Sequence, residues 1–157
     1  MTTTTGAYTT YSTDISANVK NALEKAVGLG VSYTPIAVAT QVVAGTNYRI
    51  VCNAKAATPN ADNRLCVVSI YESLQGEVKL TNVDDLMVSA QGAGGFKTFG
   101  AVGAEAANIL KTATGVGVDY TPIAVATQVV AGTNYAFLCN AKAVVPGSSN
   151  KLALVKI

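Results

Sequence analysis

Residues 33–48 read YTPIAVATQVVAGTNY, and residues 120–135 read the same sixteen letters. The segment is rich in apolar and β-branched residues, and Pro35 stands near its start, where a missing backbone N–H costs least. The letters AGTN are a turn signal between two such runs. The segment therefore predicts an antiparallel hairpin, with strands at 33–43 and 48–56, that occurs twice in the chain.

The match between residues 87 positions apart extends well beyond this segment. In the first copy it runs, with substitutions, from Asn21 to Ile70. A repeat of this length is too long for a solenoid unit and suits a small domain. We therefore expect two related modules, residues 1–86 and residues 87–157. The second has no counterpart of residues 71–83, so it is expected to lack the last strand.

Each copy begins with an amphipathic stretch before the strands. Thr13–Asp14 supply candidate N-caps for a helix that runs to about Val27, and Gly28 is the expected stop. In the second copy Gly103 falls inside the predicted helix, and Gly115 ends it. The apolar positions recur with a period of 3.6 residues, which predicts one packed face and one wet face.

The strands after the helix alternate in polarity. Even positions from Tyr48 to Ala54 are apolar and are assigned to the helix-facing side, and odd positions from Arg49 to Lys55 to the other side. Further strands are expected at residues 65–71 and 77–83, followed by a linker over residues 84–95 and a first segment of the second copy at residues 96–100. The predicted class is α+β, each module being one helix packed on an antiparallel sheet.

The turn sequence QVVAG resembles the QxVxG signature of cystatins, which inhibit papain-like cysteine proteases. The longer run TQVVAGTNY looks most like bacterial cystatin-like proteins, and the order of a helix, a hairpin and further strands also fits. The resemblance implies tandem cystatin-like modules and a papain-like cysteine protease as the partner. In that family a glycine trunk, the QxVxG hairpin and a second hairpin, often carrying Pro-Trp, form a wedge that enters the protease cleft.

The resemblance implies binding residues in both copies. The first copy offers only Gly6 as a trunk, and its second hairpin, residues 73–76, has no Pro-Trp; the second copy has no second hairpin at all. The alternative that remains open is a non-inhibitory structural or assembly protein on the same fold. The implied protease-binding residues are Gln41, Val42, Val43, Ala44, Gly45, Gly94, Gly95, Gln128, Val129, Val130, Ala131 and Gly132.

Composition argues against catalysis. The chain has 157 residues, a net charge of +2 and no histidine, so a Cys–His dyad is impossible and the commonest metal ligand is missing. We expect no enzyme, no catalytic residue, no metal and no cofactor. Scattered basic residues argue against nucleic acid, and short apolar runs argue against a membrane span. Cys52, Cys66 and Cys139 are expected to be buried free thiols, although a Cys52–Cys66 disulfide across neighbouring strands is an alternative.

The end of the second copy predicts an unpaired sheet edge. Its last strand, residues 151–157, stands where the first copy continues into another strand, and natural proteins usually cover such edges. Three partners are candidates: residues 2–11 of the same chain, the equivalent edge of another chain, and strand exchange around the turn at residue 45 or 132, so a homodimer is a possible assembly. No signal peptide is visible after Met1, so location is open, with the cytoplasm as the default.

Overall fold

The computed structural model describes residues 7–90 and 94–157. It is an α+β structure with two helices and two antiparallel sheets in the described residues, as the sequence predicts. The elements are α1 (Ala17–Ala26), β1 (Val31–Val43), β2 (Gly45–Ala56), β3 (Asn63–Glu72), β4 (Val78–Ser89), α2 (Ala104–Ala113), β5 (Val118–Val130), β6 (Gly132–Ala143) and β7 (Lys151–Lys156).

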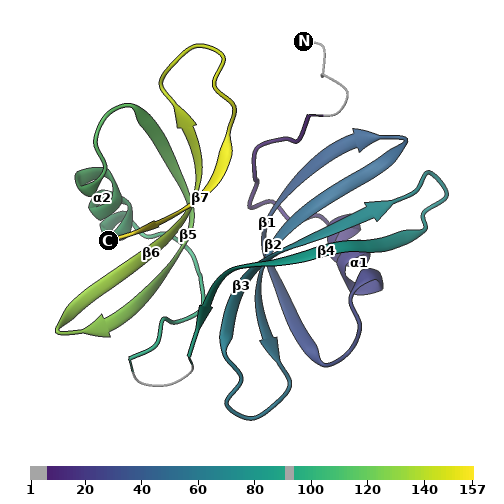
Figure 1. Ribbon diagram of the computed structural model, residues 1–157, viewed down its shortest axis with the longest axis horizontal. Coiled ribbons are helices and arrows are strands. Elements are labelled where there is room, and N and C mark those ends of the chain that lie inside the picture. Colours follow the sequence, from purple (N-terminus) through teal and green to yellow (C-terminus); the bar gives the residue numbers. More distant parts are fainter. Residues whose placement is uncertain (1–6, 91–93) are drawn as a thin grey trace.

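The two halves stack as four layers. One sheet has the strand order β1-β2-β3-β4 and the other the order β5-β6-β7, so within the described residues the second half has no counterpart of β4, as predicted. Figure 1 shows α1 and α2 on the two outer sides, with the sheets facing each other between them. The repeat thus forms one body with a shared interior.

The repeated segment forms the predicted hairpin in both halves. Val43 lies opposite Gly45, so Ala44 alone makes the tip, and Val130 lies opposite Gly132 in the same way. Each first strand has the same irregularity after its proline, because the pairing shifts by one residue there. Identical sequence therefore gives identical backbone pairing in both copies.

The helix starts differ from the prediction. Helix α1 begins after Ser16, whose Oγ accepts a hydrogen bond from the Val19 amide at 3.3 Å, so Thr13–Asp14 do not cap it. Gly103 is the N-cap residue of α2 with extended backbone, and not an interior residue. Glycine is acceptable at an N-cap, so the weakening expected from an interior glycine does not apply.

Strand β4 is longer than the sequence suggested. It continues to Ser89, so residues 84–89, expected to be linker, are strand, and the expected module boundary after residue 86 falls inside it. Asp85, which lies in the segment expected to be linker, pairs with Arg64 of β3 at 2.8 Å. A cross-strand partner of this kind is not visible in local sequence, because acidic residues are generally depleted in strands.

Buried residues form three clusters. One lies under α1 and includes Leu23 and Ile50, another lies under α2 and includes Leu110, and the third joins both sheets through residues such as Val51 and Leu138. The prediction of a sheet buried on its helix side alone is therefore wrong: Val51, on the other side of β2, has no exposed surface. The second sheet covers that face.

The first segment of each copy runs along its own sheet and is also held by the other half. Ser12 bridges to Val38 of β1, and Gly100 bridges to Val125 of β5. Tyr8 also bridges to β1. The described part of the segment, from residue 7, therefore pairs with β1 and not with β7, so the expectation that residues 2–11 cover the edge of β7 is wrong for these residues. Residues 2–6 lie outside the described residues.

Two equivalent asparagines make hydrogen bonds between the halves. Asn53 of β2 accepts from the Phe99 amide at 3.0 Å and donates to the Phe99 carbonyl at 2.8 Å. Asn140 of β6 does the same with Tyr11, at 3.0 Å and 2.8 Å. The two halves are thus related by an approximate two-fold exchange, in which each half fastens the first segment of the other.

Candidate functional site

Two glycines set the shape of the hairpin tips. Gly45 has φ 112° and Gly132 has φ 110°, in the left-handed region that side chains with a Cβ rarely adopt. The strands can therefore reverse around a single residue, Ala44 or Ala131. The glycine that ends each QVVAG sequence is therefore required by the backbone conformation of the turn.

The first letter of the motif acts inside the hairpin. Asn47 donates a side-chain hydrogen bond to Oε1 of Gln41 at 2.8 Å, and Asn134 donates the same bond to Gln128 at 2.8 Å. Each pair lies directly opposite across the two strands. These bonds brace both hairpins close to their tips.

The valines of the motif supply apolar surface. Val42 and Val129 are each 63% exposed, and Val130 is 50% exposed, whereas Val43 is partly buried. Exposed branched side chains on a braced turn suit a contact that needs little ordering on binding.

In the second half, the predicted trunk and the predicted hairpin come together. Gln128 donates from Nε2 to the Gly94 carbonyl at 2.6 Å, and Gly95 follows in the chain, partly buried. In the first half the residue that lies beside the hairpin is Tyr8, which bridges to Gln41. Gly6, the expected trunk there, lies outside the described residues.

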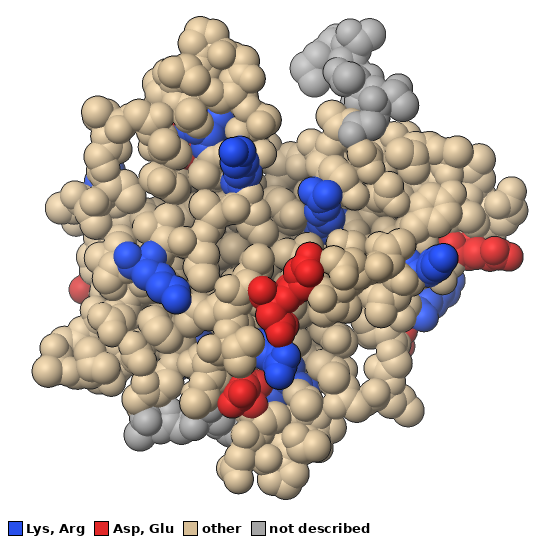
Figure 2. Space-filling model, in the orientation of Figure 1, with Lys and Arg blue, Asp and Glu red and all other residues tan. Residues whose placement is uncertain are grey.

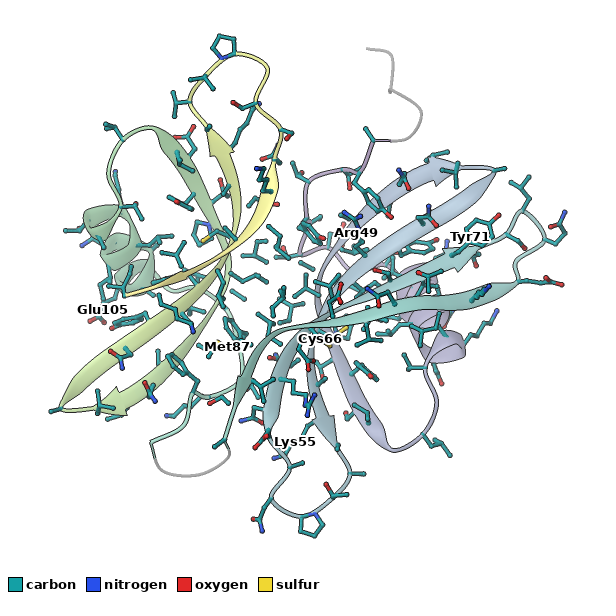
Figure 3. All side chains as sticks on the ribbon, viewed as in Figure 1. Arg49, Lys55, Cys66, Tyr71, Met87 and Glu105 are labelled. Carbon is teal, nitrogen blue, oxygen red and sulfur yellow. The ribbon has the colours of Figure 1, made fainter. Side chains whose placement is uncertain are left out.

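The first hairpin has a neighbour that the sequence did not reveal. The Tyr71 hydroxyl donates to the Ala44 carbonyl, and the adjacent Glu72 accepts a bond from the Tyr48 hydroxyl at 3.1 Å. The turn between β3 and β4, closed by the bond from the Ser73 amide to the Glu77 carbonyl at 2.8 Å, follows directly. Figure 3 labels Tyr71 close to this end of the first sheet. The only sequence signal for this contact is that Tyr71 is the first residue past the end of the repeat.

The three thiols are free and buried. Cys52 lies directly opposite Cys66 across β2 and β3, as the sequence suggested, and the free state matches the expected thiols. Burial raises the pKa of Cys66 to about 11 and that of Cys139 to about 11, and it raises the pKa of Cys52 as well. All three are neutral thiols near neutral pH, and thiols in this form are poor nucleophiles.

The described residues hold no group of three or more His, Cys, Asp or Glu that is placed to bind a metal ion. No helix in that part of the chain has the length and apolar character needed to cross a bilayer. Figure 2 shows charges of both signs scattered over one face, which is otherwise uncharged over large areas. No protein-family model and no curated protein matches the chain.

Proposed function

We propose that this chain binds and inhibits papain-like cysteine proteases through its QVVAG hairpins, on tandem cystatin-like modules. The observation that carries the proposal is the second hairpin: its braced tip exposes Val129 and Val130 and lies against the glycine segment at Gly94. Two of the three elements of a cystatin wedge are therefore adjacent there. In the first half the hairpin at Ala44 lies beside the turn at residues 73–77, which stands in for the third element.

The physical basis is a preformed apolar edge. Binding costs about 0.5–1.5 kcal/mol for each rotamer-rich side chain that must be ordered, and valine on a hydrogen-bonded turn has little freedom to lose. The left-handed glycine after the tip turns the chain back at once. A protease cleft would therefore contact the bend of a hairpin, and not an extended segment with a cleavable bond.

The test is an inhibition assay with a papain-type protease and matched valine variants. The full chain is expected to inhibit reversibly. Val129→Asp with Val130→Asp should weaken inhibition by about tenfold or more, since charge is carried into an apolar contact. The control is Val144→Asp with Val145→Asp, which alters two valines that are 60% and 61% exposed in the loop after β6. Absence of inhibition at high micromolar chain, or equal loss in both variants, would remove the proposal.

The alternative is a non-inhibitory structural or assembly protein. The observation that favours it is the edge of β7, which pairs with β6 on one side and has no strand on the other in the described residues. Under this alternative the chain leaves the protease active, and light scattering shows a homodimer or larger assembly formed by edge pairing or strand exchange.

A further inference from the structure

The two-fold exchange creates two equivalent sites, one filled and one open. In each, the first segment of one half faces the end strands of the other half. The filled site retains about 10 Å³ of free space, whereas the open site is a groove of about 450 Å³. Figure 2 shows the open site as a notch between the two halves, in the upper part of the view. Equivalent residues line both sites: Asn53 and Asn140, Arg64 and Lys151, Phe99 and Tyr11.

Strand β4 accounts for the difference. Met87 reaches from β4 into the cluster between the sheets, where Figure 3 labels it. Ser89 accepts a hydrogen bond from the Phe96 amide at 2.8 Å, and Asp85 pairs with Arg64 at 2.8 Å. The second half has no such strand in the described residues, so the corresponding volume stays open.

The edge of β7 that faces away from β6 has backbone groups that can pair with a further strand. Tyr135 and Ile157 exchange both backbone hydrogen bonds, at 2.8 Å and 2.9 Å. Since opposite pairs in an antiparallel ladder alternate, the backbone groups of Leu152, Leu154 and Lys156 point away from β6, towards the open side. These are the positions from which β3, in the first half, bonds to β4.

We propose that this groove and the β7 edge together bind an extended strand of a partner polypeptide, added antiparallel to β7. The structure of the first half specifies its chemistry. A carboxylate at the position of Asp85 would pair with Lys151, the counterpart of Arg64, and an apolar side chain two residues later would fill the place that Met87 occupies. Recognition is by main-chain pairing for affinity and by the acidic–x–apolar pattern for specificity.

A second copy of the chain fits this edge less well. Strand β7 carries Lys151 and Lys156 and no acidic residue, so a second β7 offers no carboxylate to pair with Lys151. A strand of another polypeptide that carries an acidic residue at the position of Asp85 supplies this carboxylate. This inference is independent of the hairpins, because the groove and the hairpin tip use different residues.

The test uses a labelled peptide with the sequence of β4, VKLTNVDDLMVS, and the full chain. Saturable binding is expected by fluorescence anisotropy, with amide shifts in NMR spectra at residues 151–156 and 7–11. Lys151→Glu should weaken binding by about tenfold, and a peptide with lysine in place of Asp85 should prefer that variant to the wild-type chain. Lys142→Glu, an exposed lysine on β6, is the control with the same change of net charge and should leave binding unchanged.

Three outcomes would overturn the proposal. One is no saturable binding up to millimolar peptide. Another is binding that ignores the charge at residue 151, or shifts confined to β1–β4, which would mean that the peptide replaces the chain's own β4. The third is a dimer of the wild-type chain that Lys151→Glu disrupts, which would assign the edge to a second copy.

Discussion

The tips at Ala44 and Ala131 are preceded by eleven identical residues and followed by four, and yet their surroundings differ. A Cβ added to Gly45 would overlap the Glu72 carbonyl oxygen, whereas one added to Gly132 would meet no atom of the described residues within 4 Å. The Tyr71 hydroxyl also binds the Ala44 carbonyl. Nothing equivalent to Tyr71 and Glu72 stands beside the second tip in the described residues.

The motif therefore determines its own backbone conformation but not its accessibility. Both hairpins have the same register, the same glycine conformation and the same Gln–Asn bond. What decides whether a partner can reach the tip lies outside the motif, in Tyr71 and Glu72 at the end of β3. The second hairpin is therefore the better candidate for a contact made by the tip itself.

Alanine substitution of the two glycines should give the greatest difference in stability between the two hairpins. Gly45→Ala meets both the strain of a left-handed backbone and an overlap with Glu72, which together should lower the free energy of unfolding by about 3 kcal/mol. Gly132→Ala meets the strain alone and should lose about 1 kcal/mol. Urea denaturation of both variants gives the comparison, and equal midpoints would show that the first tip is not enclosed.

A smaller difference is expected for the two asparagines between the halves. Asn53→Ala leaves the amide and carbonyl of Phe99 unpaired in a closed site and should cost about 2–3 kcal/mol. Asn140→Ala should cost about 1 kcal/mol, since the groove beside Tyr11 admits water that can replace the bonds. Thermal melts of both variants check this, and a larger loss for Asn140→Ala would contradict the open groove.

The smallest effect concerns the exposed charges on the equivalent edge positions. Arg64→Ala removes an ion pair whose side chains are 48% and 38% exposed, so it should cost at most about 0.5 kcal/mol and nothing measurable in high salt. Lys151 makes no ion pair within the part of the chain that the structure describes, so Lys151→Ala should change stability by about zero. A cost above 1 kcal/mol for Lys151→Ala would show that the second edge is already occupied.

The sequence was sufficient for the features that local chemistry determines. The repeated hairpin, the helix in each copy, the α+β class and the shorter second sheet follow from periodicity, turn residues and the 87-residue offset. Cys52 and Cys66 face each other because the strand lengths around the loop after β2 set the register.

The sequence was not sufficient where long-range packing decides. Val51 shares its face of β2 with polar residues, so the sequence predicts that this face is exposed to solvent. Its burial is explained only by the second sheet, which packs against that face. Residues 84–89 are acidic enough to read as linker, and only pairing with β3 makes them strand. The hydrogen bond from Tyr71 to the tip joins residues 27 positions apart, and no local sequence pattern predicts it.

The exchange of first segments has a consequence for synthesis. Tyr11 is bound by an asparagine 129 positions later, and Phe99 by one 46 positions earlier. As the chain leaves the ribosome, the segment that contains Tyr11 emerges long before β6, the strand that binds it. Until the second sheet has formed, the inner face of the first sheet stays exposed to solvent. Contacts of such large sequence separation form slowly, so the two halves are expected to reach their final stability together, only after β6 has been made.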